Sequence, residues 1–294
     1  MMSIPTKKLH LTFLITGCSS GLGLLLSRCV LSHGHTLIAT SRDPSRTPQL
    51  VSEIESLGGR WHTLDVNSPT AGAELVAALS LSGIQIDVLI NNAGFSIHAP
   101  VETFAEEELW DMMETLYFGP ARLMRAVLPH MRERRKGVIV NISSGAGLEG
   151  RPSMGGYAAS KAALDGMSKV LAQEMEPFGV RVLTVQLGSF DTNMTNAART
   201  GKLPVPEDYK GTLVDLITQQ LTGGGFEPDG DAEKAAKAVY EVIVGEGVGE
   251  GKEKEVMLPL GRDMFKRLEK VRDGHARAME VFGEVCNNVY RNGS

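Results

Sequence analysis

The sequence predicts an α/β protein built on a doubly wound parallel sheet of about seven strands flanked by helices. Two observations lead to this fold class. Short runs rich in β-branched residues alternate with longer segments of helical periodicity, which is typical of βαβ units. A glycine-rich turn follows directly after the first of these runs, as in nucleotide-binding sheets.

Seven apolar runs are expected to be the strands of this sheet. They cover residues 11–16, 36–40, 60–66, 86–93, 137–144, 181–187 and 255–260. The first run is too short for a signal-peptide core or a membrane span, and no other segment approaches the roughly 20 apolar residues that a transmembrane helix needs. We therefore expect a soluble protein without a membrane span.

Two segments between the strands carry strong helical patterns. In residues 106–135, apolar side chains recur at spacings of three and four, and the helix is expected to bend at Gly119 and Pro120. Its apolar stripe consists of Leu109, Met112, Met113, Leu116, Leu123, Val127 and Met131. The second helix, 157–176, is expected to end before Pro177 and Gly179.

The remaining segments suggest additions to one domain that spans residues 1–294, with a core of about 10–260. Residues 191–231 hold three prolines and a triple glycine, which favours a lid over a site, although an ordinary surface insertion is the alternative. The apolar pattern of the C-terminal extension, about 261–294, predicts an amphipathic helix. Its apolar residues are expected to pack on the body or on a partner subunit, and they are Phe265, Leu268, Val271, Met279 and Phe282.

Composition excludes several function classes. The chain has 294 residues, 42% of them hydrophobic and 22% charged, which is ordinary globular usage. A formal net charge of -5 gives no basic footprint for nucleic acid. Cys18, Cys29 and Cys286 are widely spaced and show no metal-ligand pattern, so we expect no metal and a reducing, cytoplasmic location.

The turn "TGCSSGLG" after the first strand predicts a dinucleotide site. Glycines there allow close approach of a diphosphate, and backbone N–H groups at the start of the following helix face the anion. The glycines alone would also suit a bare turn, so the strand and helix on either side carry the argument. The expected contacts are Gly17, Ser19, Ser20, Gly21, Leu22 and Gly23.

The end of the second strand, "ATSRD", bears on the choice of cofactor. An acidic side chain at this place binds the ribose 2′-hydroxyl of NAD, whereas a basic one suits the 2′-phosphate of NADP. Ser41 and Arg42 stand there and favour NADP. Asp43 follows one residue later and keeps NAD open, and Arg42 could also be an ordinary surface arginine.

Two further strand ends complete the expected cofactor site. Asp65 and Val66 follow the third strand and are expected at the adenine, although a loop aspartate is equally often a cap. The fourth strand ends in "NNAG", where Asn91 and Asn92 can tie strand ends together. In this motif Asn92, Ala93 and Gly94 are the expected cofactor contacts.

The catalytic residues are expected in the segment "NISSGAGLEGRPSMGGYAASK". Ser144 ends the fifth long strand, and Tyr157 and Lys161 lie one helical turn apart, so phenol and ammonium share a face. A nearby ammonium lowers the pKa of a phenol and makes it usable as an acid or base. In isolation the pair would read as a core aromatic and a solvated lysine. Its position after a nucleotide turn and a serine-terminated strand favours catalysis.

At this point the sequence resembles the short-chain dehydrogenase/reductase family, in its single-domain NADP(H)-dependent form, over about residues 10–260. The resemblance implies a Rossmann-like fold, a nicotinamide cofactor and hydride transfer. It also implies that Tyr157 is the acid/base, that Lys161 holds the ribose and assists Tyr157, and that Ser144 orients the substrate. Ser143 competes for that last role, but the family spacing of thirteen residues before Tyr157 selects Ser144.

The chain departs from the family pattern in two places. Relatives carry an asparagine three residues before the glycine that corresponds to Gly119, and it helps to hold a water that links the lysine to solvent. Leu116 stands there, and its side chain cannot form a hydrogen bond, although a main-chain carbonyl could still bind a water. In the second place, Leu187 replaces a proline before Gly188. Gly188 and Thr192 remain as expected cofactor contacts, Thr192 at the nicotinamide amide or the diphosphate.

These residues predict an NADPH-dependent carbonyl reductase, or the reverse alcohol dehydrogenase, acting on a hydrophobic small molecule. The expected pocket follows the cofactor-side strand ends and contains no charged residue, which argues against an anionic substrate. Its members could equally be ordinary packing. They are Phe95, Ser96, Leu148, Met154, Phe190 and Met194.

Two alternatives stay open, both favoured by Leu116. The first is non-redox catalysis, such as an isomerisation, dehydration or cyclisation of a biosynthetic intermediate. The second is an NADP-binding module with little turnover. The resemblance further implies a homodimer or homotetramer formed through the helices 106–135 and 157–176.

Overall fold

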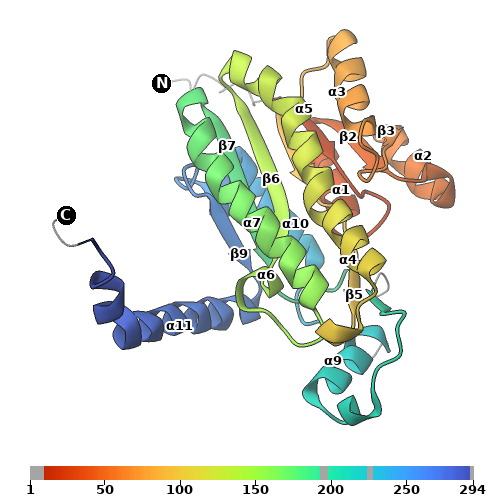
Figure 1. Ribbon diagram of the computed structural model, residues 1–294. Coiled ribbons are helices and arrows are strands. Elements are labelled where there is room, and N and C mark those ends of the chain that lie inside the picture. Colours follow the sequence, from red (N-terminus) through yellow and green to blue (C-terminus); the bar gives the residue numbers. More distant parts are fainter. Residues whose placement is uncertain (1–9, 193–197, 224–227, 292–294) are drawn as a thin grey trace.

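Seven parallel strands form the central sheet of the computed structural model (Figure 1), which describes residues 10–192, 198–223 and 228–291. The strand order is β3-β2-β1-β4-β6-β7-β9. All seven runs expected from the sequence are strands, and their ends differ from the expected ends by at most three residues. They are β1 Thr12–Ile15, β2 Thr36–Ser41, β3 Arg60–Thr63, β4 Val88–Asn91, β6 Gly137–Ser144, β7 Val180–Leu187 and β9 Met257–Leu260.

The order of the strands places a crevice in the middle of the sheet. The chain runs from β1 outward to β3, returns to pair β4 with the other side of β1, and then continues to β9. The direction of winding therefore reverses between β1 and β4, and ligands bind at the carboxyl ends of the strands at such a switch point. This is the Rossmann-like arrangement that the sequence led us to expect.

Helices cover both faces of the sheet because successive strand residues point to opposite sides. Phe13 and Ile15 belong to the core under α1 (Gly21–Ser32) and α10 (Ala232–Val244). Leu14, between them, belongs to the core under three other helices. These are α3 (Ala71–Leu81), α5 (Gly119–Arg134) and α7 (Gly155–Met175), and α5 and α7 lie side by side across the sheet in Figure 1. The shorter α2 (Pro48–Ser56) lies beside β3.

The predicted helix 106–135 is interrupted by a π-helical turn. It consists of α4 (Glu106–Met113), the π turn Glu114–Phe118 and α5. Pro120 has no N–H to donate to the carbonyl four residues earlier, and its ring crowds that carbonyl, which belongs to Leu116. Pro120 thus accounts for the local widening, in agreement with the expected irregularity at Gly119 and Pro120.

The segment predicted as a lid contributes a strand and a helix. β8 (Ala198–Thr200) pairs in parallel with β5 (Ser96–His98), outside the main sheet. α9 (Leu213–Thr222) follows Pro204 and Pro206. In Figure 1 the described part of this segment lies beyond the carboxyl ends of the strands, beside the start of α4. Met194 lies outside the described residues.

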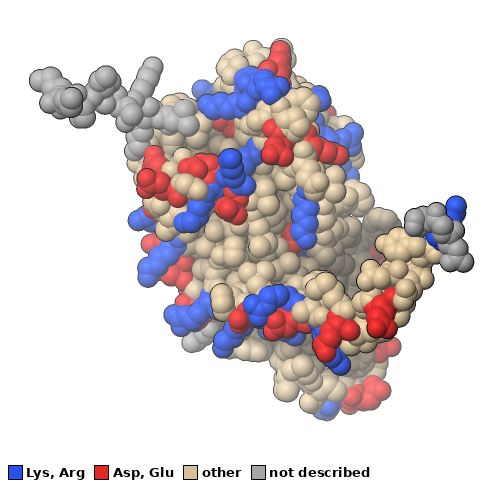
Figure 2. Space-filling view, turned by 90° about the vertical axis from the view of Figure 1, so that its left-hand side faces the viewer, with Lys and Arg blue, Asp and Glu red and all other residues tan. Residues whose placement is uncertain are grey.

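The C-terminal helix α11 (Arg262–Asn287) projects from the body, as Figures 1 and 2 show. Met264 in its first turn is buried, and Leu268 and Val271 are half-buried. Phe265, Met279 and Phe282 are 70%, 68% and 58% exposed. The expectation that these three pack on the body is therefore wrong, because the helix axis leads away from the sheet. Packing on a partner subunit stays a prediction.

Candidate active site

A cavity of about 550 Å³ opens at the carboxyl ends of the strands and brings together most of the residues singled out in the sequence. Ser144, Tyr157 and Lys161 line it together with the expected cofactor contacts. The latter are Gly17, Ser19, Ser20, Gly21, Leu22, Ser41, Arg42, Asp65, Val66, Asn92, Ala93, Gly94, Gly188 and Thr192. Residues from separate βα turns therefore share one site.

The glycine turn is shaped by close backbone approach. Gly17 has a φ of 72°, and a Cβ there would lie 2.8 Å from the Cα of Ala93. Gly23, expected to contact the cofactor, does not line the cavity. A Cβ at Gly23 would collide with the carbonyl oxygen of Gly17 and with the side-chain amide of Asn92. Its role is to let α1 pack on the turn, which corrects the expectation.

A hydrogen-bonded clamp joins β1 to β4 beneath this turn. The Thr16 hydroxyl accepts hydrogen bonds of 3.0 Å from the backbone N–H groups of Asn92 and Ala93. The Asn92 side-chain amide donates to the carbonyls of Thr16 (2.9 Å) and Gly17 (3.2 Å). The tie expected from Asn92 is thus present, whereas sequence reasoning missed Thr16, the first residue of the glycine motif.

The two acidic residues at the adenine end have different surroundings. Asp43 accepts hydrogen bonds from the Ser45 backbone N–H (3.1 Å) and hydroxyl (2.6 Å), and it does not line the cavity. Asp65 lines the cavity and also accepts a 3.0 Å hydrogen bond from the backbone N–H of Asn67. Asp65 therefore combines the two alternatives that the sequence offered, because it caps its turn and faces the site.

Ser144, Tyr157 and Lys161 converge from β6 and α7. The Ser144 hydroxyl oxygen accepts a 3.2 Å hydrogen bond from the backbone N–H of Ala146. Tyr157 and Lys161 are 7% and 5% exposed, and the Lys161 Nζ lies 5.7 Å from the centroid of the Tyr157 ring. The same Nζ donates a 2.7 Å hydrogen bond to the carbonyl of Ile142 on β6, which fixes the ammonium beside the phenol.

Burial controls the ionisation of this pair. It raises the pKa of Tyr157 to about 12, against the hydrogen bond with Ser144, which lowers it. It lowers the pKa of Lys161 to about 8, against the attraction of Asp165, which raises it. Without a bound cofactor, burial therefore outweighs the lowering of the phenol pKa that the sequence led us to expect. At neutral pH the phenol is protonated.

Sequence reasoning missed Asp165, which lies one helical turn after Lys161 on α7. It is 4% exposed, and the Gln186 side-chain amide on β7 donates a 3.2 Å hydrogen bond to it. Burial raises the pKa of Asp165, while the hydrogen bond from Gln186 and the charge of Lys161 lower it. The signal was available, because Tyr157, Lys161 and Asp165 recur every four residues and so share one face.

Leu116 packs instead of facing the cavity. Its side chain is fully buried in an apolar cluster with Ile97, Met112 and Tyr157, and its Cδ2 would lie 2.9 Å from a Cβ at Gly94. The neighbouring Thr115 lines the cavity and donates a 2.9 Å hydrogen bond to the Asn67 side chain. The π turn thus presents a hydroxyl to the site, from the residue beside Leu116.

Four of the six residues expected in the substrate pocket lie at the cavity. Phe95, Ser96, Met154 and Phe190 line the cavity, whereas Leu148 does not, and Met194 lies outside the described residues. Ala146 and Leu148 belong to the one-turn helix α6 (Ala146–Glu149). Two residues are about 200° apart around a helix, so Ala146, which lines the cavity, turns Leu148 away.

The expectation of an uncharged pocket is wrong. Arg151, Arg199, Arg267 and His98 all line the same cavity. These residues come from the α6–α7 loop, β8, α11 and β5. No sequence spacing relates them, because only the folding of distant segments brings them to one cavity.

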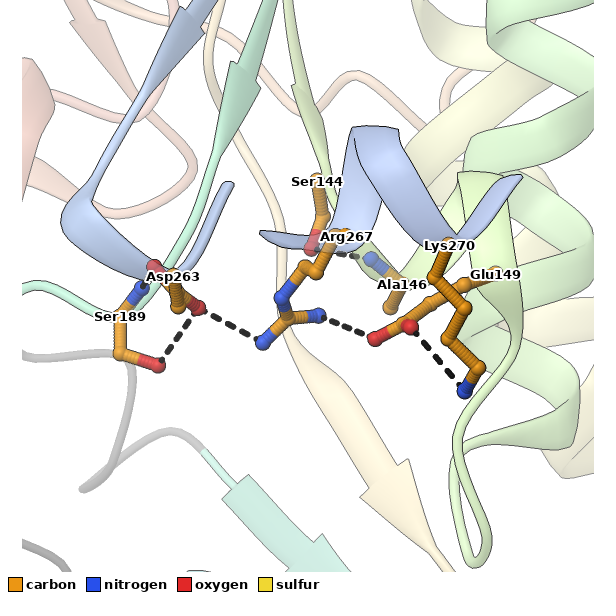
Figure 3. A network of polar contacts seen from close by, with 7 residues as sticks. All are labelled: Ser144, Ala146, Glu149, Ser189, Asp263, Arg267 and Lys270. Atoms are coloured by element: carbon orange, nitrogen blue, oxygen red, sulfur yellow. Dashed lines mark hydrogen bonds and ion pairs between the residues drawn. The ribbon is translucent and has the colours of Figure 1, made fainter. Parts of the chain in front are cut away.

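Arg267 belongs to a network of polar contacts that anchors α11, shown in Figure 3. Its guanidinium bridges Asp263 (2.7 Å) and Glu149 (3.3 Å), and Lys270 also binds Glu149 (3.4 Å). Asp263 accepts hydrogen bonds from Ser189 at 3.4 and 3.5 Å. The network holds the first turns of α11 against α6 and the chain that leaves β7, at the edge of the cavity.

In residues 10–192, 198–223 and 228–291, no three His, Cys, Asp or Glu side chains are grouped as metal ligands. Over the same described residues, no helix combines the length and apolarity needed to cross a membrane.

Comparison with known proteins identifies the family. Residues 11–203 match the model of the family described as short chain dehydrogenase. The chain is 41% identical over 218 residues to "Oxidoreductase claN" of Passalora fulva, covering 74% of this chain and 98% of that protein.

Solved structures agree. A short-chain dehydrogenase from Streptomyces avermitilis superposes with a TM-score of 0.85 at 33% identity, over 97% of this chain and 100% of that one. A serine dehydrogenase in complex with NADP+ matches at 27% identity and a TM-score of 0.69, over 85% and 94% of the two chains. With the glycine turn, the strand order and the convergence of Ser144, Tyr157 and Lys161, these matches show that this oxidoreductase chain belongs to the short-chain dehydrogenase/reductase family.

Proposed function

We propose that this protein is an NADP(H)-dependent carbonyl reductase, or the reverse alcohol dehydrogenase, and that its substrate has a largely hydrophobic body. The observation that carries the proposal is the convergence of Ser144, Tyr157 and Lys161 on the cavity that the glycine turn lines. The same cavity can therefore hold a dinucleotide and a carbonyl compound side by side.

The residues at the dinucleotide end fit such a cofactor. Gly17 and Gly21 line the cavity without a side chain, and backbone N–H groups at the start of α1 can receive a diphosphate. Arg42 is exposed and lines the cavity, whereas Asp43 is turned toward Ser45. A guanidinium at this place suits a 2′-phosphate, which supports NADP(H) over NAD(H). The relative that binds NADP+ points the same way.

The catalytic roles follow from the ionisation of the site. When bound, NADPH supplies the hydride for the carbonyl carbon. Tyr157 is protonated at neutral pH and donates its proton to the carbonyl oxygen, while the Ser144 hydroxyl orients that oxygen. Lys161 is largely charged at neutral pH, and its ammonium stabilises the phenolate that remains. In the oxidative direction the phenolate accepts the proton again.

The substrate side of the cavity supports an apolar substrate body. Phe95, Met154 and Phe190 line it, and Ser96 adds a hydroxyl. We further propose that the described part of residues 191–231 covers this side as a lid, because Ala198, Leu221 and Pro228 also line the cavity. The chain would act as one domain, since elements from residue 17 to residue 267 form one site.

Leu116 favours one second candidate, non-redox catalysis by Tyr157 on a biosynthetic intermediate, such as an isomerisation or dehydration. The buried leucine packs against Tyr157 where relatives carry a hydrogen-bonding amide. If protons from solvent reach Tyr157 slowly, the site would suit reactions in which Tyr157 gives up its proton and regains it from the substrate within one turnover. An NADP-binding module with little turnover would share the same feature.

The assembly and location proposed are a cytoplasmic homodimer or homotetramer. Trp110 on α4 and Val170 on α7 are 60% and 56% exposed, on the two helical regions through which the resemblance implies dimerisation. Burial of these apolar side chains against a second copy would remove them from water. Size-exclusion chromatography with light scattering tests the assembly.

The oxidation of NADPH with a panel of ketones tests the function. We expect turnover with the unaltered protein, and Tyr157→Phe should lower kcat at least about a hundredfold while leaving NADPH binding intact. Tyr290→Phe, at a 72% exposed tyrosine, is the matched control and should be fully active. Measurable NADPH binding without turnover of any ketone would contradict the reductase proposal. It would favour non-redox catalysis or an NADP-binding module.

A further inference from the structure

Two arginines on the substrate side of the cavity have no anionic partner among the described residues. Arg151 lies in the loop between α6 and α7, three residues before Met154, and is half-buried. Within residues 10–192, 198–223 and 228–291 its side chain forms no hydrogen bond and no ion pair. Burial of an unpaired guanidinium is unfavourable, so a group that binds it from the cavity would be stabilised.

The carboxylates near Arg151 are already used. Glu149 binds Arg267 and Lys270, and Asp263 binds Arg267. Both carboxylates attract Arg151 from a distance, while the charge of Arg267 repels it, and burial lowers the pKa of Arg151. The cations Arg151, Arg267 and Lys270 thus outnumber the carboxylates Glu149 and Asp263. This leaves one excess positive charge beside the cavity.

Arg199 adds a second guanidinium from the small sheet. It lies on β8 opposite Ile97 of β5, and the centre of its guanidinium is 5.1 Å from the centroid of the Phe95 ring. Contact with an aromatic ring holds a guanidinium while its N–H groups stay available to an anion. In the described part of the chain Arg199 forms no ion pair either.

His98 also lines the cavity and is neutral at physiological pH. Its burial and the charge of Arg151 lower the pKa of His98 to about 4. Its Nε2 shares a 3.0 Å hydrogen bond with the Ser96 hydroxyl, while its Nδ1 is buried without a hydrogen-bond partner among the described residues. Two carboxylates also line the cavity, Asp65 at the adenine end and Asp111 of α4. Asp111 pairs with neither arginine.

From this arrangement we propose that Arg151, assisted by Arg199, binds an acidic group of the substrate. The substrate would then carry three features, a carbonyl group at Tyr157, an apolar body and one carboxylate or phosphate. The planar fork of a guanidinium matches the oxygens of both acidic groups. The inference rests on the proposed function for the position of the carbonyl group, and it replaces the uncharged substrate expected from the sequence.

Unreactive probes test the acid site separately from catalysis. Decanoate, decyl phosphate and the neutral decanamide are titrated calorimetrically into the NADPH-loaded protein, and NADPH reduces none of them. We expect decanoate or decyl phosphate to bind at least tenfold more tightly than decanamide, and the tighter of the two identifies the acidic group. Arg151→Gln should weaken binding of the acidic probe at least tenfold and leave decanamide binding unchanged.

Three further variants sharpen the result. Arg151→Lys keeps the charge without the fork and should retain part of the affinity, and Arg199→Gln should weaken binding less than Arg151→Gln. Arg277→Gln on the exposed part of α11 is the matched control and should bind like the unaltered protein. Melting temperatures measured in parallel show that each variant is folded.

Two outcomes would overturn the proposal. One is equal affinity for the acids and decanamide, or no effect of Arg151→Gln in a folded protein. The other is a loss of NADPH affinity in Arg151→Gln, which would assign Arg151 to the cofactor. Because the probes are not turned over, loss of acid binding in Arg151→Gln would uphold the acid site even if every ketone failed as a substrate.

Discussion

The ammonium of Lys161 is bound to the main chain of β6 by a 2.7 Å hydrogen bond to the carbonyl of Ile142. This contact fixes a buried charge beside Tyr157 independently of any side chain at position 116. Asp165, on the next turn of α7, supplies the attraction that favours the charged form of Lys161. The charge state of the site therefore depends on a residue that does not line the cavity.

Asp165→Asn should shift the pH dependence of reduction. Lys161 has a pKa of about 8 in the free protein, so kcat/KM should fall as the pH rises through about 8 and the ammonium loses its proton. Because Asp165 raises this pKa, its removal should lower the pKa and move the alkaline limb of the profile to lower pH, by about one unit. The measurement is kcat/KM between pH 6 and 10.

Asp165→Glu, which keeps the charge, is the control. It should leave the alkaline limb of the kcat/KM profile close to the pH at which it lies in the unaltered protein. A profile that keeps its shape in Asp165→Asn, with only an overall loss of rate, would show that Asp165 acts through structure alone.

Leu116→Asn should destabilise the protein. The leucine is fully buried among apolar side chains, so the variant loses that packing and buries an amide without a partner, at a cost of about 3 kcal/mol in the free energy of unfolding. Leu116→Met, of similar volume, should cost less than about 1.5 kcal/mol. Urea denaturation measures both. A many-fold gain in turnover by a stable Leu116→Asn protein would contradict this and show that the amide restores a path for protons.

Gly23→Ala should impair the cofactor site through packing. The added methyl group would collide with the Gly17 carbonyl and the Asn92 amide, so the turn must shift. We expect a loss of about 1–3 kcal/mol in stability and at least a tenfold rise in the Kd for NADPH, measured by fluorescence titration. Gly166→Ala, on α7 with open space around it, should instead gain about 0.5–1 kcal/mol. Unchanged NADPH affinity in Gly23→Ala would show that the turn tolerates the shift.

Arg42→Ala should weaken the use of NADPH selectively. Loss of one charge-assisted contact to a 2′-phosphate should raise the KM for NADPH about tenfold or more, and the KM for NADH should hardly change. Arg46→Ala, four residues along and also exposed, is the control. An unaltered protein that prefers NADH by tenfold or more would overturn the assignment of the cofactor.

The central sheet could be predicted because its signals are local in the sequence. Each strand is a short apolar run, and the turn after β1 carries its glycines within eight residues. Tyr157 and Lys161 could be paired because one helical turn separates them, and the same spacing would have revealed Asp165. Gly23 shows the limit of such reasoning, because a glycine in the motif can serve backbone packing instead of the ligand.

The charge of the substrate side could not be predicted in this way. Arg151, Arg199 and His98 come from three segments whose relation depends on the pairing of β5 with β8 and on the loop before α7. Whether a charged side chain lines a cavity depends also on which carboxylates neutralise it, and here Glu149 and Asp263 are taken by residues of α11.

By itself the sequence determined the parallel sheet, the glycine turn and the pairing of Tyr157 with Lys161, because periodicity and spacing along one chain fix which residues share a face. The choice of Ser144 came from the resemblance to the family. Only the tertiary structure decided that Leu116 packs in one apolar cluster with Tyr157 and that α11 projects from the body. It also decided that two arginines with no ion-pair partner among the described residues line the cavity. These features depend on burial and on neighbours far away in the chain, which no local pattern encodes.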